Sequence, residues 1–307
     1  MGLARNLLLW ASRNRWIESQ VRRRSFARRA VRRFMPGEEL DAALAAAAEL
    51  KTRKFGTVLT QLGEAIADRA EAQAVHDHYV QVLGRIREQA LPALVSVKPT
   101  QLGLDLDAGA CADWIADLAA RAGPDVVFID MEDSNYVDPT LALFRRVRER
   151  RANVGVCLQA YLRRTPADLE ALLPLNPAVR LVKGAYAEPA DRAFPRKADV
   201  DAAYLALSTR LIEHAAAHHA PAPVVGTHDV GLIAECQRRA AAAGLDRRAC
   251  EVHMLYGIRT GEQARLLREG HVVRVLISYG RAWFRWYMRR LAERPANVWF
   301  VVKSLAG

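Results

Sequence analysis

The segment VRLVKGAY, residues 179–186, has the pattern of a buried β-strand that ends in a turn. Its first four residues are apolar apart from Arg180, and Lys183 and Gly184 follow where the apolar run stops. A strand inside a sheet holds the side chains at its carboxyl end in fixed positions. We therefore expect a charged site at the end of this strand, surrounded by the rest of the chain.

Seven more strand patterns occur along the chain, and helical patterns alternate with them. The eight strand candidates cover residues 57–62, 93–97, 126–129, 154–158, 179–182, 224–227, 251–255 and 272–277. The helical patterns include residues 38–53, 107–121, 138–150, 166–172, 200–217, 231–242, 261–269 and 281–292. Eight parallel βα units close into a barrel of ~250 residues. The sequence therefore predicts an α/β fold, a (βα)8 barrel.

An open, doubly wound sheet is the main competing fold. Its dinucleotide fingerprint GxGxxG does not follow the first strand, and no GxxxxGK phosphate loop occurs. No internal repeat or Pro/Ser-rich linker indicates a second globular domain. We expect an N-terminal helical arm with flanking helices over residues 1–54 and the barrel over residues 55–307.

Positive charge is concentrated at the start of the chain. Residues 1–36 contain ten arginines and one acid, Glu18, and so carry +9 of the formal net charge of +11. A basic segment at the start of a chain is typical of an arm or a membrane-facing surface. A nucleic-acid-binding protein would be expected to carry its positive charge on the main globular part of the chain. No apolar run approaches the ~20 residues that span a bilayer. We expect a cytoplasmic protein with a peripheral membrane contact, and an organellar transit peptide is the less favoured interpretation.

The four cysteines, Cys111, Cys157, Cys236 and Cys250, are widely spaced and form no CxxC pair. Neither a disulfide framework nor a zinc site is predicted from them, and a reducing compartment suits them. His214 and His218 have the i, i+4 spacing of a metal-binding pair, but no carboxylate motif accompanies them. We expect a solvated helix end there and predict no metal site.

Polar side chains follow nearly every strand candidate, at the end of a barrel where active sites lie. They are Glu64, Lys98, Asp130, Glu132, Gln159, Tyr161, Lys183, Tyr186, Thr227, His228, Asp229, Tyr256, Ser278 and Tyr279. Each has a plainer interpretation, such as a rim charge for Lys98 or a helix-capping set of acids for residues 130–133. Their density favours a functional site.

Two types of chemistry fit the cations of this region. Lys98 and Lys183 at strand ends suggest a Schiff-base lysine of an aldolase-type barrel, which requires a desolvated lysine. Arg289 and Arg290 follow an aromatic-rich segment with Trp283 and could clamp a carboxylate bidentately beside a flat ring. Adjacent arginines on a helix are more often solvated, so this pair alone is weak evidence.

Taken together, the motifs resemble the one-domain bacterial, flavin-dependent proline dehydrogenases. The similarity runs from about residue 34 to the C-terminus through FMPGEELDAA, LTQLGE, SVKPTQLGLD, IDMEDSNYVDPTL, LQAYLRRT, VRLVKGAYAEP, THD, MLYGIR and YGRAWFRWYMRRLAERPAN. The resemblance implies a distorted barrel that binds FAD non-covalently. It also implies hydride transfer from L-proline to the flavin, pyrroline-5-carboxylate as the product and a membrane quinone as the electron acceptor.

The resemblance also implies roles for individual residues. Arg180 matches the cation beside the hydride-accepting flavin nitrogen, and with Asp130 it is the expected catalytic pair. The positions expected to line the cofactor are Asp130, Met131, Gln159, Arg180, Lys183, Gly184, Ala185, Thr227 and His228. Substrate contacts are expected from Lys98, Leu255, Leu276, Arg289 and Arg290, with Glu64 as a gate that pairs with the first of these arginines.

The sequence departs from the family pattern in and beside the last strand. Leu276 stands where a tyrosine usually packs on the substrate ring, Ser278 replaces a proline, and His253 replaces a glutamine. Loss of the aromatic contact opens room near the far carbon of the substrate. A substituted ring such as hydroxyproline is therefore the alternative substrate, and the aldolase is the more remote alternative function.

Overall fold

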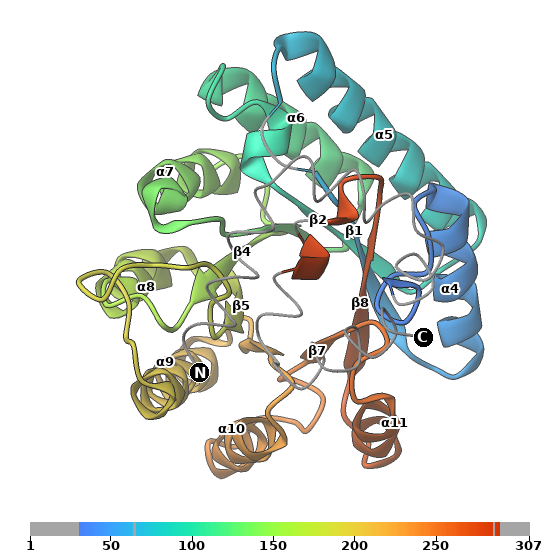
Figure 1. Ribbon diagram of the computed structural model, residues 1–307. Coiled ribbons are helices and arrows are strands. Elements are labelled where there is room, and N and C mark those ends of the chain that lie inside the picture. The colour runs from blue at the N-terminus through green and yellow to red at the C-terminus, as the bar shows by residue number, and fades with distance from the viewer. Residues whose placement is uncertain (1–30, 64–65, 285, 289–307) are drawn as a thin grey trace, which may run out of the picture.

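Eight parallel strands close into a barrel in chain order in the computed structural model, which describes residues 31–63, 66–284 and 286–288 (Figure 1). The strands are β1 (Gly56–Gln61), β2 (Ala93–Val97), β3 (Val127–Ile129), β4 (Val154–Gln159), β5 (Ala178–Val182), β6 (Val224–Gly226), β7 (Val252–Leu255) and β8 (Val273–Tyr279). Each strand differs from its predicted bounds by two residues or fewer at either end. The predicted fold class is confirmed.

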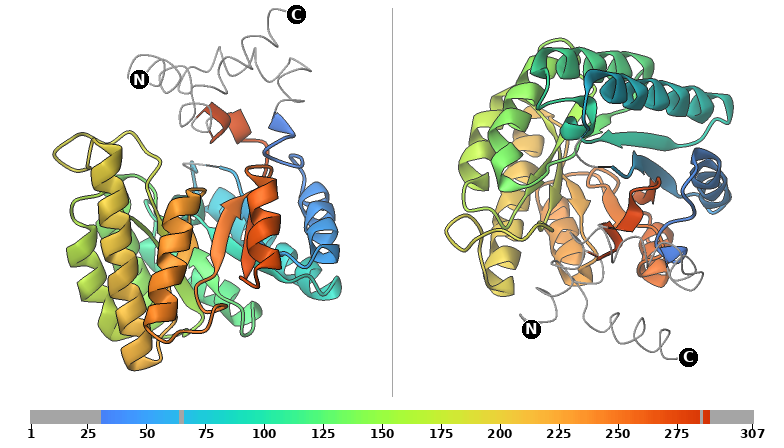
Figure 2. Two further views of the ribbon diagram at one scale, coloured as in Figure 1. Left: turned by 90° about the horizontal axis from the view of Figure 1, so that it is seen from below. Right: turned by 45° about the horizontal axis from the view of Figure 1, so that its top comes forward.

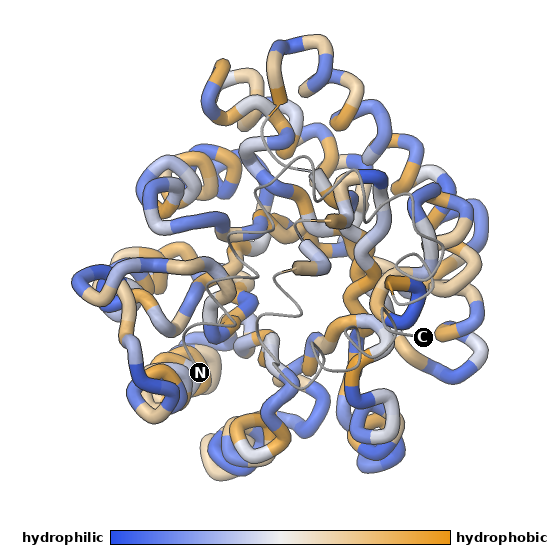
Figure 3. Tube along the Cα trace, viewed as in Figure 1, coloured by the Kyte–Doolittle hydropathy of each residue, from blue (hydrophilic) through white to orange (hydrophobic). Residues whose placement is uncertain are grey.

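A helix joins each strand to the next. These helices are α5 (Arg69–Glu88), α6 (Ala108–Arg121), α7 (Val137–Arg148), α8 (Thr165–Leu172), α9 (Lys197–His218), α10 (Val230–Ala242) and α11 (Thr260–Arg268). Aspartate side chains cap α5, α6 and α10, where Asp68, Asp107 and Asp229 accept from backbone N–H groups of the first turn. The helices mix hydrophobic and hydrophilic positions, as amphipathic helices do (Figure 3).

Helix α4 (Leu40–Thr52) comes before the first strand but belongs to the ring of helices. It lies between α11 and α5, the place that a helix following β8 would take (Figure 1). Its buried residues Ala43, Leu44, Ala47 and Leu50 belong to the same hydrophobic cluster as residues of β1 and β8. The chain therefore closes its outer layer with a helix from the N-terminal side.

The inside of the barrel has an apolar layer beneath a polar one. Strand register places Val58 beside Leu94 and Leu276, and these side chains pack in one cluster with Phe128 and Val224. Side chains two residues apart on a strand share a face. Ser96 and Asp130 therefore point inward as well, one step closer to the carboxyl ends of β2 and β3.

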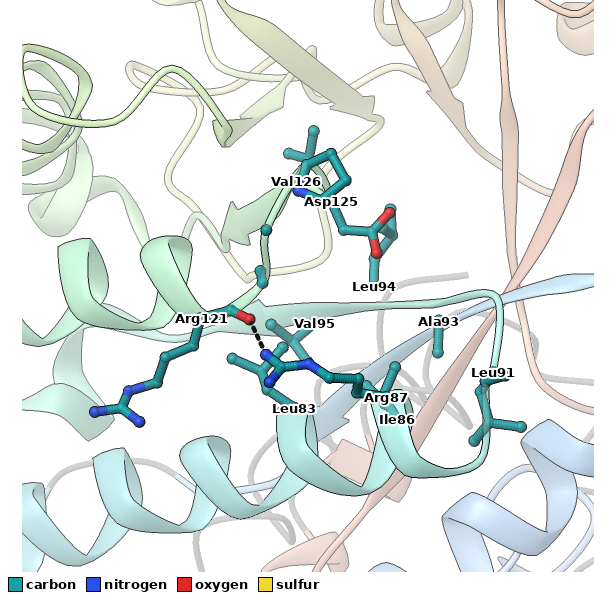
Figure 4. Close-up of a pocket in the computed structure, with 14 residues that line it drawn as sticks. Leu83, Ile86, Arg87, Leu91, Ala93, Leu94, Val95, Arg121, Asp125 and Val126 are labelled. Atoms are coloured by element: carbon teal, nitrogen blue, oxygen red, sulfur yellow. Dashed lines mark hydrogen bonds between the residues drawn. The ribbon is translucent and has the colours of Figure 1, made fainter.

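A pocket of about 320 Å³ lies at the opposite end of the barrel, beneath the starts of β2 and β3 (Figure 4). Leu83, Ile86 and Arg87 of α5 line one side of it, and Arg87 donates to the carbonyl oxygen of Arg121 at 2.8 Å. The amino ends of barrel strands serve stability, whereas chemistry takes place at the carboxyl ends. The candidate site is therefore expected at the carboxyl ends of the strands.

Residues 281–284 and 286–288 lie over the carboxyl end of the barrel (Figure 2). Trp283, Phe284, Trp286, Tyr287 and Met288 are buried there in a cluster with Val31, Met35 and Leu62. The indole nitrogen of Trp283 donates to Glu38 at 2.8 Å, and Arg281 pairs with Glu39 at 2.9 Å. The segment preceding α4 thus anchors the segment that follows β8. No helix in the described part of the chain is both long enough and apolar enough to cross a membrane.

Candidate active site

Four polar side chains from three strands meet inside the barrel at its carboxyl end. Asp130 accepts from the Ser96 hydroxyl at 2.6 Å and from the Lys98 ammonium group at 3.3 Å, and it forms an ion pair with Arg180. Arg180 also donates to the Ser96 oxygen at 2.9 Å. Only 3% of Arg180 and 8% of Lys98 are exposed. Buried charges of this kind persist in proteins because they are paired.

The charges of this cluster stabilise one another. Burial by itself would raise the pKa of Asp130, but Arg180 and Lys98 and the hydrogen bonds from Ser96 and Lys98 lower it below its usual value. Burial would lower the pKa of Arg180, and the Asp130 carboxylate raises it instead. Asp130 is therefore ionised at neutral pH. It orients the two cations and is not suited to accept a proton.

The guanidinium group of Arg180 also rests on an aromatic ring. Its Cζ atom lies 5.0 Å from the centre of the Phe128 ring, a cation–π contact. That ring and the His253 ring make a T-shaped contact, with ring centres 5.8 Å apart and planes at 79°. Nη1 of Arg180 is buried without a hydrogen-bond partner in the part of the chain that the structure describes. A buried donor of this type indicates a missing partner.

Two glycines beside this cluster lie where a larger residue would not fit. Gly184 has a φ of +114°, and a Cβ atom there would lie 2.1 Å from the Tyr161 ring. A Cβ atom on Gly226 would lie 2.8 Å from Val182. Oε1 of Gln159 is buried without a partner among the described residues, while its amide nitrogen donates to the Glu132 carbonyl oxygen at 3.0 Å. A buried acceptor and a buried cationic donor without partners among the described residues fit a flat ring with polar edges, as in FAD.

The remaining predicted cofactor residues lie at the ends of β3, β5 and β6, each with protein contacts of its own. Lys183 donates to Asp201 at 2.5 Å and to Asp229 at 2.9 Å, which uses two of its three N–H donors. The Thr227 hydroxyl accepts from the Asp229 amide at 3.2 Å. Nε2 of His228 accepts from the Leu255 amide at 3.3 Å. Met131 is buried, and Ala185 is partly exposed beside Gly184.

The predicted substrate wall lies on the last two strands. Leu255 and Leu276 are register partners, and Leu276 packs on the inner apolar layer. Ser278 is 1% exposed. His253 lies 3.3 Å from Glu251, and burial lowers the pKa of this histidine to about 4 despite that carboxylate. His253 is therefore neutral at pH 7. Glu64, Arg289 and Arg290 lie outside the described residues.

The structure adds Ser96 and Phe128 to the site, and neither residue was predicted from the sequence. Ser96 lies two residues before Lys98 and so on the same face of β2, which is the only sequence signal for it. The capping interpretation of residues 130–133 is right for Asp133, which accepts from the Asn135 amide at 3.0 Å. It is wrong for Asp130, which binds Arg180, and for Glu132, which accepts from the Thr100 hydroxyl at 2.7 Å.

The histidines, cysteines and lysines that were considered for metal, disulfide or aldolase chemistry can be placed as follows. His214 lies 2.7 Å from Asn176 and its ring centre is 4.5 Å from that of His218. Among the residues that the structure describes, no group of three or more histidines, cysteines or acids could hold a metal ion. All four cysteines are free and buried. The aldolase hypothesis requires a desolvated lysine that acts as a nucleophile, whereas the Nζ atoms of Lys98 and Lys183 contact carboxylates.

Comparisons with known proteins agree on one family. The family model described as proline dehydrogenase matches residues 43–303. Proline dehydrogenase 1 of Bacillus subtilis strain 168 is 33% identical over 305 residues, which is 99% of each chain. Proline dehydrogenase of Deinococcus radiodurans is 36% identical over 282 residues, which is 89% of each chain.

Solved structures share the fold. The crystal structure of proline utilization A from Bdellovibrio bacteriovorus, inactivated by N-propargylglycine, has a TM-score of 0.80 over 93% of this chain at 22% identity. Proline utilization A from Corynebacterium freiburgense has a TM-score of 0.71 over 95% of this chain at 20% identity. The chain spans 37% and 33% of those two longer proteins. At this identity the likeness concerns the barrel alone.

Proposed function

The chain belongs to the proline dehydrogenase family of oxidoreductases, and we propose that it oxidises L-proline, or a close cyclic imino acid, with FAD as its cofactor. The proposed product is pyrroline-5-carboxylate, and the proposed electron acceptor is a membrane quinone. The observation that carries this proposal is the buried cation Arg180, whose Nη1 donor has no partner among the described residues, inside a barrel of this family.

The reaction removes a hydride from the ring carbon beside nitrogen and a proton from that nitrogen, which leaves a C=N bond. Bound FAD supplies the hydride acceptor. Arg180 would stabilise the negative charge that develops on the acceptor, because a preorganised buried cation acts strongly in a site that excludes water. Asp130 fixes the guanidinium group and compensates its charge.

The substrate is proposed to lie between the strand ends and the segment after β8. Lys98 reaches this region from β2, and its contact with Asp130 fixes its ammonium group. Arg289 and Arg290 are proposed to hold the carboxylate of the amino acid, with Glu64 as the gate. A planar guanidinium fork matches a carboxylate with two parallel hydrogen bonds.

The ring specificity is a second proposal, which rests on Leu276. This side chain is part of the inner wall, where the family places a tyrosine. A smaller, apolar side chain favours a substrate with a group on the far ring carbon, such as 4-hydroxyproline. The basic N-terminal segment is proposed to bind an anionic membrane surface, where each basic residue contributes ~1 kcal/mol. A cytoplasmic location on the inner face of the membrane follows from that proposal.

Anaerobic flavin bleaching tests the function directly. Protein purified with FAD is mixed with L-proline, 4-hydroxyproline and D-proline, and the visible absorbance of oxidised flavin is followed. We expect L-proline or a substituted L-proline to bleach the flavin and D-proline to be slow. A protein that does not bind FAD, or whose flavin no cyclic amino acid reduces, contradicts the proposal. Borohydride trapping of a lysine adduct would instead support the aldolase alternative.

A further inference from the structure

Arg180 is held inside the barrel by more than its ion pair with Asp130. The Ser96 hydroxyl lies between the two charged groups, accepting from Nη2 of Arg180 at 2.9 Å and donating to Asp130 at 2.6 Å. Ser96 is completely buried. A hydroxyl group carries one donor and two acceptor sites, so it can serve both partners at once. Ser96 therefore fixes the rotation of the guanidinium group relative to the carboxylate.

Phe128 packs against the same guanidinium group. Its ring lies 5.0 Å from Cζ of Arg180 and is only 2% exposed. Ser96 and Phe128 are register partners on β2 and β3, so both face the inside of the barrel. The ring is in turn in T-shaped contact with His253. The cation therefore contacts an aromatic ring, a hydroxyl group and a carboxylate.

These contacts leave one part of Arg180 unused. The guanidinium fork carries five N–H donors in a fixed plane. Nη2 is engaged by Ser96 and Asp130, while Nη1 has no partner among the described residues although it is buried. A change in the side-chain torsions of Arg180 would rotate this free donor away from its present direction. Ser96 and Phe128 oppose that rotation.

We propose that Ser96 and Phe128 are positioning residues that set the orientation of Arg180 and so reserve its Nη1 donor for the flavin. This inference rests on the function proposed above. Neither side chain needs to touch the flavin or the substrate for this role. The role is to determine where the positive charge of Arg180 lies, which governs how well a negative charge on the flavin is stabilised.

Sulfite binding to the flavin tests this role without turnover. Sulfite adds reversibly to oxidised flavin and leaves a negative charge on the ring, so its affinity reports on a neighbouring cation. We expect Ser96→Ala and Phe128→Leu each to weaken sulfite binding ~10-fold, the effect of one charged hydrogen bond or one desolvated cation–π contact. Phe128→Tyr keeps the aromatic face and should stay within about twofold of the wild type.

Matched controls separate orientation from simple packing. Ser208 in α9 and Phe144 in α7 are completely buried and lie outside the barrel interior, in the outer layer of helices. Ser208→Ala and Phe144→Leu should lower the melting temperature yet leave the sulfite affinity and the flavin spectrum unchanged. If Ser96→Ala does not fold, Ser96→Cys has nearly the same shape with a weak donor and carries the same expectation.

The outcomes distinguish this inference from the proposed function. A wild-type protein that binds no flavin refutes the proposed function and the inference with it. A wild type that binds flavin, with Ser96 and Phe128 variants that bind sulfite as tightly as the wild type, refutes the inference alone. Weakened sulfite binding in these variants and in both controls alike also refutes it, because the effect would then be a general loss of packing.

Discussion

Asp130→Asn removes the anion between two buried cations while keeping the shape of the side chain. In the native cluster Asp130 contacts Lys98 and Arg180, and the exposed fractions of the three side chains are 17%, 10% and 4%. The amide oxygen of asparagine can still accept from Ser96. It carries no charge, so both cations lose their partner in a medium that solvates them poorly.

The size of the effect follows from that burial. Removing one partner of a buried ion pair costs ~3–5 kcal/mol of folding stability, because an uncompensated charge stays behind. We expect a loss near 3 kcal/mol for Asp130→Asn, at the lower end of that range, since one hydrogen bond survives. Asp138→Asn is the matched control, because it breaks the pair with Arg164 on the surface, where Asp138 is 77% exposed. That change should cost ~0–1 kcal/mol.

Urea unfolding at one fixed FAD concentration measures both variants against the wild type. Equal slopes with a shifted midpoint would mean that the difference lies in stability. If Asp130→Asn lowers the free energy of unfolding no more than Asp138→Asn, the buried cluster is not the charge-compensated unit that its contacts indicate. An unchanged stability would also remove the argument that Asp130 compensates the charge of Arg180.

Three further predictions concern specificity, pH and the membrane. Leu276→Tyr should raise kcat/KM for L-proline ~10-fold in a steady-state assay, because it restores the contact with the substrate ring. Leu106→Tyr on the exposed surface is the control. Unchanged selectivity between proline and hydroxyproline would argue against a role for Leu276. Burial lowers the pKa of His253 to about 4. Between pH 4 and 6.5 the unfolded chain therefore binds a proton that the folded chain does not. The free energy of unfolding should fall by about 3 kcal/mol as the pH drops through this window. His253→Gln should flatten the dependence of stability on pH, measured by urea titrations at several pH values. An equal dependence in both proteins would show that His253 is not the group responsible. Deleting residues 1–30, which contain eight arginines, should abolish flotation with anionic vesicles, and undiminished flotation of the truncated chain would rule this segment out as the membrane contact.

The barrel could be predicted because short apolar runs alternate with helical patterns over the whole chain. Helix α5 is the element that the predicted helices do not include. Its buried face contains Tyr79 and His76 together with apolar residues, so the hydrophobic period is interrupted by polar atoms. Both polar groups have partners that only the fold supplies: Tyr79 donates to the Ser96 carbonyl oxygen, and His76 lies 2.9 Å from Asp117 of α6. Polar residues on a buried helix face remain ambiguous in sequence.

The candidate site was predictable where residues follow a strand and not where they lie within one. Lys98, Asp130 and Gln159 come at or directly after strand ends, and the structure brings all three to the carboxyl end of the barrel. Ser96 and Phe128 lie inside strands that are buried on both faces. Such strands read as continuous apolar runs, so the pattern does not show which alternate residues face the interior. Register between neighbouring strands, known only from the fold, assigns them to the inner face.

Arg180 lies within a strand and was nevertheless predictable as a site residue. It is the single charged residue in the run that forms β5, and a buried guanidinium group without partners would destabilise the barrel by several kcal/mol. Its presence at that place therefore requires an anion and a hydrogen-bonding group on neighbouring strands. Asp130 and Ser96 meet this requirement, and Phe128 provides the surface beneath. A fully buried arginine in the middle of an apolar strand is accordingly a stronger sign of a site than a polar residue at a strand end, where solvent alone could account for it.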